Sequence, residues 1–252
     1  MQNVSFFYSR RTRLLNRRRG EWILQNVSLD LREGECIGIV GESGSGKSTL
    51  AHVIGRQYRA QSGEIFYGGK QNFSRKEFCR YVQNIWQFPG DALDPLWSIG
   101  KTLREPLKIH FPDLSRLAVE EKIKELLHGV SLDDSLLQRR PSALSGGQKQ
   151  RVALARALAV GPCVLICDEV TSALDMPVQW EILNLLNILR AKQRLAILFI
   201  SHDIAAVAQV ADRVIVMQKG KIIESGPTAE ICRHPHHRYT ETLINEVLAM
   251  RI

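Results

Sequence analysis

The sequence predicts an α/β protein, in which helices cover both faces of a mainly parallel β-sheet. Runs of Val, Ile, Leu and Phe alternate along the chain with stretches of helical periodicity, which is typical of a parallel sheet. The clearest runs are nearly continuous in apolar residues, as expected of strands buried on both faces. These predicted strands are Cys36–Val40, Val164–Cys167, Ala196–Ile200 and Val214–Met217. The predicted helices are Lys47–Arg56, Arg116–His128, Gln148–Ala159 and Gln179–Gln193.

Further elements are expected at the two ends and in the middle of the chain. A first strand at Val4–Tyr8 begins so early that we expect a few preceding residues to be missing. A turn at Lys219–Lys221 leads into a returning strand at Ile222–Glu224. The region from about 88 to 144 is rich in helical patterns and lacks strong strand runs, so it is predicted to be a helical subdomain inserted into one α/β core.

Length and composition are those of an ordinary globular protein. The 252 residues are 44% hydrophobic and 24% charged, and no apolar run approaches the roughly 18 residues of a membrane-spanning helix. The N-terminal arginines are not followed by the apolar stretch of a secretory signal. We therefore expect a soluble, intracellular protein.

The net charge of +8 would, by itself, favour a nucleic-acid or anionic-membrane partner. Six arginines between residues 10 and 19 supply most of this excess, so the charge describes one segment rather than a surface. The segment is interpreted as a solvated hairpin loop, with contact to anionic lipid or to a partner subunit as the alternative. The five cysteines are scattered, as in a protein with reduced thiols, and Cys163 and Cys167 are expected to be small core residues.

The strongest motif is a complete phosphate-binding loop of the form G-x-x-x-x-G-K-[ST] between a predicted strand and a predicted helix. Its glycines let consecutive backbone N–H groups converge on phosphate oxygens, and the helix N-terminus adds its dipole. Lys47 would bridge the β- and γ-phosphates, and the Ser48 hydroxyl would bind Mg²⁺. The predicted nucleotide-binding residues here are Gly41, Glu42, Ser43, Gly44, Ser45, Gly46, Lys47, Ser48 and Thr49.

Two carboxylates follow the predicted strand Val164–Cys167. Asp168 is placed to hold Mg²⁺, directly or through water, together with Ser48. Glu169 can polarise the water that attacks the γ-phosphorus, and a positioned general base contributes on the order of 10²–10⁴ in rate. An Asp-Glu pair after a strand is weak evidence by itself, and it gains value from the phosphate loop in the same chain.

A third motif, Leu-Ser-Gly-Gly-Gln at residues 144–148, opens the predicted helix Gln148–Ala159. Ser145 and the two glycines offer exposed backbone N–H groups at a second helix N-terminus, which indicates a second anion site. One nucleotide does not need two γ-phosphate sites in the same chain. We therefore expect a dimer in which this motif of one chain covers the nucleotide held by the phosphate loop of the other.

Together these motifs resemble the nucleotide-binding subunit of an ABC transporter over essentially the whole chain. The resemblance implies one domain over residues 1–252, with a P-loop NTPase (RecA-like) core over 1–87 and 158–252. It further implies an N-terminal antiparallel β subdomain, and a helical subdomain over 88–157 that carries the Leu-Ser-Gly-Gly-Gln signature.

The resemblance also assigns roles to single residues. Gln87 would contact Mg²⁺ or the attacking water, and His202 would contact the γ-phosphate. Asp175 would act across the dimer, and Tyr8 would stack on adenine, with Phe7 and Trp22 as nearby competitors. The implied catalytic residues are Glu169, His202, Gln87 and Lys47, and the implied Mg²⁺ ligands are Ser48, Gln87 and Asp168. The signature residues implied to contact nucleotide are Ser145, Gly146, Gly147 and Gln148.

Within that family, three features resemble the dipeptide, oligopeptide and nickel uptake branch: the loop at 41–46, the run from Gln87 to Pro95 and the H-P-x-x-x-Y-T tail at 234–240. The chain departs from the usual pattern after Gln87, where Phe88 replaces Asp, and at Val170, where Pro is common. Neither departure removes a catalytic group. A metal site formed by the tail histidines is the less favoured interpretation of that segment.

The resemblance implies an ATP- and Mg²⁺-dependent ATPase that energises import of peptides, nickel or another metal chelate. Its implied partners are a second ATPase subunit in a heterodimer, two membrane permeases and an extracytoplasmic solute-binding protein, with no nucleic acid. The implied location is the cytoplasmic face of the cell membrane. An ATPase of a soluble enzyme complex, such as carbon–phosphorus lyase, is the alternative, and a DNA-repair ATPase fits the charge but not the chain length. The sequence does not identify the cargo.

Overall fold

The computed structural model describes residues 1–8 and 21–249, and these residues form two compact units. The first unit comprises Met1–Arg32, Cys36–Phe73 and Phe199–Ile252, and the second comprises Glu33–Glu35 and Ser74–Leu198. The arginine-rich segment between residues 10 and 19 lies outside the described residues. The predicted division into a core and a helical subdomain over 88–157 stays a prediction.

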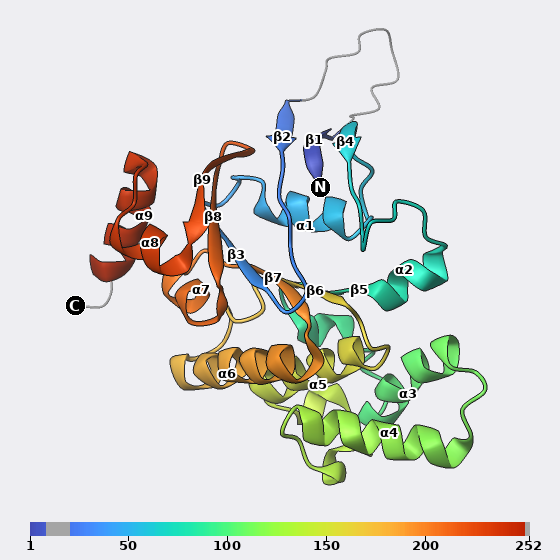
Figure 1. Cartoon of the computed structure of the whole chain (residues 1–252). Helices are drawn as coiled ribbons and strands as arrows, with labels where there is room; N and C mark the ends of the chain where they lie inside the picture. Colours follow the sequence, from blue (N-terminus) through green and yellow to red (C-terminus); the bar gives the residue numbers. More distant parts are fainter. Residues whose placement is uncertain (9–20, 250–252) are drawn as a thin grey trace, which may run out of the picture. The chain divides into compact units, whose positions relative to one another are not determined.

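In the first unit, a small antiparallel sheet has the strand order β2-β1-β4 (Figure 1). Strand β1 (Gln2–Phe7) pairs on one side with β2 (Trp22–Val27) and on the other with β4 (Ser62–Glu64). Side chains of Val4 and Leu24 are completely buried beneath it. The predicted first strand therefore belongs to an antiparallel sheet at the N-terminus.

The first unit also contains a group of strands with helices packed against it. Strand β3 (Cys36–Val40) runs parallel to β8 (Arg213–Gln218), which pairs antiparallel with the returning strand β9 (Lys221–Pro227). All five residues of β3 are buried, because helix α7 (Ile204–Val210) packs closely against it. A Cβ atom on Gly38 would lie 2.1 Å from the Cγ1 of Val207, so only glycine allows this approach.

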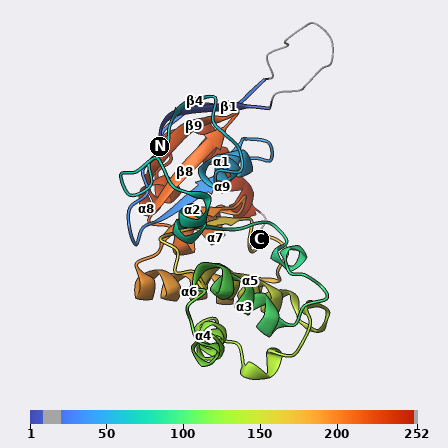
Figure 2. The same cartoon turned by 90° about the vertical axis from the view of Figure 1, so that its right-hand side faces the viewer.

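Three further helices belong to the first unit. Helix α1 (Lys47–Ile54) follows the phosphate loop directly. Its 8 residues make it about one turn shorter than a typical domain helix, and it is two residues shorter than predicted. Helices α8 (Thr228–Arg233) and α9 (Arg238–Ala249) end the described chain and lie beside β8 and β9 in Figure 1, whereas Figure 2 shows α8 and α9 at different depths behind the strands.

The second unit combines helices with the parallel strands β5 (Val82–Ile85) and β6 (Val164–Asp168). Its α-helices are α2 (Arg75–Tyr81), α3 (Ile99–His110), α4 (Arg116–Gly129), α5 (Gly146–Leu158) and α6 (Met176–Gln193). Short 3₁₀ turns lie at Pro89–Ala92, Asp134–Leu136 and Pro141–Ala143. Helices α3, α4 and α5 pack on one another through buried side chains that include Leu103, Ile123 and Val152.

Strand β7 (Ala196–Ile200) begins in the second unit and ends in the first. At its start the N–H of Ala196 donates to the carbonyl of Cys163 at 3.0 Å, just before β6. Just after its end the N–H of Ser201 donates to the carbonyl of Ile39 in β3 at 3.1 Å. The prediction that both cysteines beside β6 are core residues is wrong for Cys163, which is exposed because it precedes the strand, whereas Cys167 is buried.

Candidate nucleotide-binding site

The phosphate loop curls back on itself between β3 and α1. Gly41, Gly44 and Gly46 have φ angles of 152°, 81° and 104°, a region that side chains other than glycine rarely occupy. A Cβ atom on Gly41 would lie 2.2 Å from the carbonyl oxygen of Met217 in β8. The motif therefore needs glycine at Gly41 for two reasons, its dihedral angle and the close approach of neighbouring backbone.

The Lys47 ammonium lies inside this curl. Its Nζ donates to the carbonyl oxygens of Gly41 at 2.7 Å and Glu42 at 2.8 Å, and the residue is only 6% exposed. The carbonyl of Glu42 also accepts the Ser45 N–H at 3.1 Å. The loop thus holds a positive charge at its centre, where a phosphate group would sit.

The start of α1 is suited to an anion. Among the described residues, no side chain caps this N-terminus, whose N-cap is Gly46, and its first turn contains no acidic residue. The Oγ atom of Ser45 is buried and has no hydrogen-bond partner within the described part of the chain. Uncapped backbone N–H groups, the helix dipole and an unpaired hydroxyl together form a site that phosphate oxygens can satisfy.

The aromatic residue predicted to stack on adenine is linked to the same helix. The Tyr8 hydroxyl lies 3.1 Å from the Oγ1 of Thr49, in the first turn of α1, and the residue is 46% exposed. Its ring contacts Phe6 and Tyr58 edge-on, at centroid distances of 5.0 and 5.5 Å. Phe7 instead pairs with Trp22. Of the three candidates, Tyr8 is therefore the one whose hydroxyl contacts the phosphate-loop helix in the described part of the chain.

His202 belongs to the first unit and follows β7 in a short turn. It is exposed, and its neighbours Ser201 and Asp203 shape the turn. The N–H of Asp203 donates to the Oγ of Ser201 at 3.0 Å, and the Asp203 carboxylate caps α7 by accepting the Ala205 N–H at 2.8 Å. The histidine side chain is thus presented at a defined point after the strand.

In the second unit, the two carboxylates at the end of β6 differ in their surroundings. Asp168 is buried at the strand end, with 5% exposure, whereas Glu169 is half-buried and has a φ angle of 49°. The Nε2 of Gln87 donates to the Oε2 of Glu169 at 3.3 Å, although the two residues are far apart in the sequence. Ser172 fixes the glutamate backbone, because its Oγ donates to the Glu169 carbonyl at 2.9 Å.

The signature motif lies in the same unit and opens α5. Ser145 is the N-cap: its Oγ accepts the Gln148 N–H at 3.2 Å, and its own N–H donates to the Gln148 side chain at 3.1 Å. This capping box gives Gln148 a structural role that its predicted contact with nucleotide did not include. Gly146 is exposed, and a Cβ atom on Gly147 would lie 2.5 Å from the Cγ1 of Val178 in α6.

Asp175 is the N-cap residue of α6, but its side chain makes no capping hydrogen bond to that described helix. It is exposed, so its carboxylate can take other partners. Within the described part of the chain, no group of three His, Cys, Asp or Glu side chains is arranged to hold a metal ion, and the tail histidines form no such group. Across the same residues, no helix is long and apolar enough to cross a membrane.

The curled loop, the buried lysine and the uncapped helix define a P-loop nucleotide-binding protein. Residues 24–172 match the family model described as ABC transporter. The chain therefore belongs to the ABC transporter family, and the predictions of an ABC-type ATP-binding subunit and of a P-loop NTPase fold are confirmed.

Three proteins illustrate the similarity. The oligopeptide transport ATP-binding protein OppF of Haemophilus influenzae is 42% identical over 89% of this chain and 69% of its own length. The glutathione import ATP-binding protein GsiA of Pectobacterium atrosepticum is 40% identical over 94% of this chain, which spans only 39% of GsiA. The dimeric, post-hydrolysis structure of the ATP-binding cassette MJ0796, bound to ADP and Pi, is 28% identical, covers 90% of this chain and 97% of that one, and has a TM-score of 0.77.

Proposed function

We propose that this chain is the ATP-hydrolysing subunit of an ABC importer that takes up peptides. The observation that carries the proposal is the phosphate loop, which holds the Lys47 ammonium against the carbonyls of Gly41 and Glu42 beside an uncapped helix N-terminus. The similarity to OppF and GsiA, which are named for oligopeptide transport and glutathione import, supports a peptide cargo. Nickel and other metal chelates remain the cargo alternatives.

Lys47 and Glu169 have the central roles in the proposed reaction. In the described structure the Lys47 ammonium is bound to loop carbonyls, and we infer that it exchanges them for β- and γ-phosphate oxygens when nucleotide binds. Glu169 would accept a proton from the attacking water. The hydrogen bond from Gln87 holds the Glu169 carboxylate in one orientation, which a general base requires.

The remaining predicted residues complete the proposed site. The oxygen groups of Ser48, Asp168 and Gln87 are of the type that Mg²⁺ prefers, and bound Mg²⁺ would neutralise charge on the phosphates. His202 would donate to the γ-phosphate, and Tyr8 would stack on adenine. Ser145, Gly146 and Gly147 would offer N–H groups to the nucleotide of a partner chain, and Asp175 would interact across that dimer.

The proposed assembly follows the prediction from the sequence. It contains a second, different ATPase subunit, two membrane permeases and an extracytoplasmic solute-binding protein, and it places this chain at the cytoplasmic face of the membrane. The similarity to a transport ATP-binding protein over 69% of its length favours this assembly over a soluble enzyme complex such as carbon–phosphorus lyase.

The catalytic proposal is tested by the variant Glu169→Gln in the complex purified from detergent-solubilised membranes. We expect ATP hydrolysis to fall on the order of 10²–10⁴-fold, because the amide cannot accept a proton, while nucleotide binding is retained. Glu125→Gln is the matched control, since Glu125 is an exposed glutamate of α4 paired only at the surface with Lys122. Unchanged hydrolysis in Glu169→Gln would contradict the assignment of the general base.

The transport proposal is tested by identifying what co-purifies with the tagged chain. Two polytopic membrane proteins and a second ATPase are expected, and the associated binding protein can then be titrated with di- and oligopeptides and with nickel chelates. A soluble enzyme assembly in their place would reject the importer and leave the proposed ATP hydrolysis intact.

A further inference from the structure

We propose that Tyr239, in the C-terminal helix α9, is a positioning residue of the phosphate loop and sets its affinity for nucleotide. This inference rests on the proposed nucleotide binding and adds a residue outside the motifs that predicted it. The backbone N–H of Glu42 donates to the Tyr239 hydroxyl oxygen at 2.8 Å. The bond lies within the first unit and joins the second residue of the loop to the tail of the chain.

The bond fixes the peptide group between Gly41 and Glu42. The N–H of Glu42 and the carbonyl of Gly41 belong to the same planar unit, so one cannot turn without the other. That carbonyl accepts the hydrogen bond from Lys47 Nζ at 2.7 Å. Because Gly41 has no side chain, rotation of this peptide plane meets little steric resistance. The hydrogen bond to Tyr239 therefore selects the orientation in which the carbonyl faces the ammonium group.

The orientation of the next peptide group, which contains the Glu42 carbonyl, depends on that of the first. The Glu42 carbonyl accepts both the Lys47 Nζ, at 2.8 Å, and the Ser45 N–H, at 3.1 Å. The placement of Glu42 therefore sets the first turn of the loop and one of the two carbonyls around Lys47. Lys47 would exchange these carbonyls for phosphate oxygens, but a loop backbone that Tyr239 already orders still loses less conformational entropy on binding nucleotide than a loop that must first be ordered.

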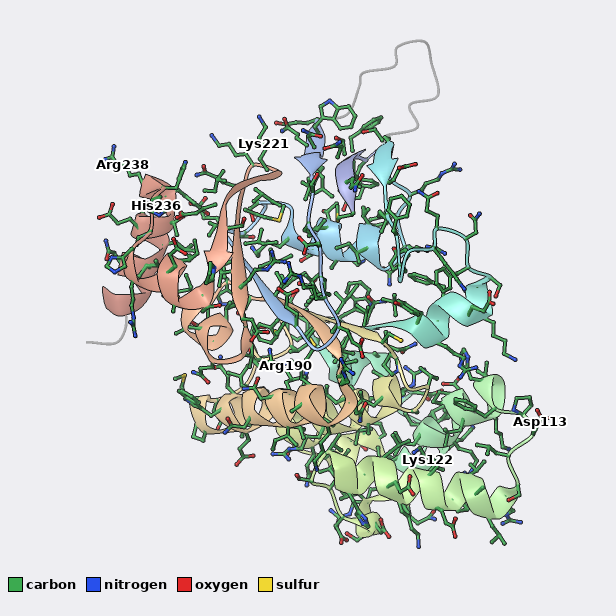
Figure 3. All side chains as sticks on the ribbon, in the orientation of Figure 1. Asp113, Lys122, Arg190, Lys221, His236 and Arg238 are labelled. Carbon is green, nitrogen blue, oxygen red and sulfur yellow. The ribbon has the colours of Figure 1, made fainter. Side chains whose placement is uncertain are left out.

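Tyr239 is itself held in place by the turn that precedes α9. The Glu224 carboxylate, on β9, accepts the N–H groups of His236 at 2.7 Å and His237 at 3.2 Å. The N–H of Tyr239 then donates to the Nδ1 of His237 at 3.1 Å. His236 lies in this turn and Arg238 starts the helix that follows (Figure 3).

Helix α9 is held against the first unit by the residue that follows Tyr239. Thr240 is completely buried, and Leu243, one turn further on, is 7% exposed. The side chains of Thr240 and Leu243 hold the first two turns of α9 against the unit. Tyr239 directly precedes Thr240, and its hydroxyl group reaches the phosphate loop. The tail pattern H-P-x-x-x-Y-T thus supplies a turn, an anchor and one hydroxyl group directed at Glu42.

The direct test compares Tyr239→Phe with Tyr67→Phe in the full chain. Both variants delete one tyrosine hydroxyl in the first unit; Tyr67 donates to the Ile54 carbonyl at 2.5 Å, at the other end of α1 from the phosphate loop. The dissociation constant of a fluorescent ATP analogue and the melting temperature are measured for both. We expect about fivefold weaker binding in Tyr239→Phe, equivalent to about 1 kcal/mol, and binding within about twofold of wild type in Tyr67→Phe.

A double-variant cycle tests the route through the tail turn. Glu224→Gln weakens the acceptor of the two histidine N–H groups, so it should reduce nucleotide affinity in the presence of the Tyr239 hydroxyl and have little further effect in Tyr239→Phe. In steady-state assays of the assembled complex, KM for ATP should rise in Tyr239→Phe while kcat is retained.

Two results would overturn the inference: wild-type affinity in Tyr239→Phe, or an equal loss of affinity in Tyr67→Phe, which would indicate a general effect of lower stability. Additive losses in the double variant would reject the route through Glu224. Failure of the wild-type chain to bind the ATP analogue at all would instead reject the proposed function, so the two failures are distinguishable.

Discussion

Replacement of Gly41 by alanine should destabilise the chain more than the same replacement at Gly44. Both glycines lie in the phosphate loop and both have positive φ, so each substitution carries the backbone cost of that conformation, about 1 kcal/mol. They differ in their surroundings. A Cβ atom on Gly41 would lie 2.2 Å from the Met217 carbonyl oxygen and 2.9 Å from the Ser45 Oγ, whereas a Cβ atom on Gly44 meets nothing within 4 Å.

The difference in stability between the two variants depends on which backbone must shift to make room for the new Cβ atom. The Met217 carbonyl belongs to β8, whose backbone is fixed by pairing with β3 and β9, so the loop must shift instead. Forcing an extra carbon into a well-packed site costs about 1–3 kcal/mol. We therefore expect a total loss of about 3 kcal/mol for Gly41→Ala and about 1 kcal/mol for Gly44→Ala.

Thermal unfolding of the two variants beside the wild type measures this difference. For a chain of this size, 1 kcal/mol corresponds to about 2–4 °C, so the melting temperature should fall by about 6–12 °C in Gly41→Ala and about 2–4 °C in Gly44→Ala. If the two variants melt within about 2 °C of each other, the loop can move away from β8, and the close approach at Gly41 is not a constraint on the fold.

Three further predictions concern an exposed ion pair, a helix cap and the pH dependence of stability. Glu181→Gln should cost less than about 1 kcal/mol in urea unfolding, because Glu181 is 60% exposed in its pair with Arg151. Ser145→Ala should cost about 1 kcal/mol through loss of the α5 cap, and an unchanged unfolding midpoint would contradict the capping box. Burial would raise the pKa of Glu224, but contact with the Thr240 side chain, hydrogen bonds from the His236 and His237 N–H groups and the charge of His236 outweigh burial and lower that pKa, so its charged form stabilises the fold above pH 4.5. The difference in melting temperature between wild type and Glu224→Gln should therefore shrink as the pH falls through the lowered pKa of Glu224; a constant difference in acid would contradict this.

The strands that sequence patterns predicted best are those buried on both faces. All five residues of Cys36–Val40 and of Ala196–Ile200 are buried, and both strands have the predicted bounds, because burial on two sides leaves a continuous apolar run. Strand β5 (Val82–Ile85) was not among the predicted strands, since only its two end residues are buried and its middle is polar. Helix α7 (Ile204–Val210) was also not predicted, because its seven largely apolar residues show no clear helical period.

The phosphate loop could be predicted from its spacing, whereas contacts between distant residues could not. The loop lies within eight consecutive residues, so strand, glycines and helix fix its geometry locally. The hydrogen bonds from Gln87 to Glu169 and from Glu42 to Tyr239 join residues from different elements. Motif resemblance placed Gln87 and Glu169 at one site, but the two hydrogen bonds themselves depend on how the elements pack, and no periodicity in the sequence contains that information.

Eight non-glycine residues of the described chain have positive φ, and Glu169 is the one among them with a predicted catalytic side chain. A non-glycine residue at φ 49° carries a cost of about 1–3 kcal/mol, which persists only where the surroundings hold it. Here the surroundings are specific: the N–H and Oγ of Ser172 both donate to the Glu169 carbonyl, at 3.3 and 2.9 Å. Glycine would adopt this conformation at no steric cost but would offer no carboxylate. The chain therefore holds a strained glutamate at the end of a buried strand, with its carboxylate oriented by Gln87, and such strain is understandable if the carboxylate has a function in that position.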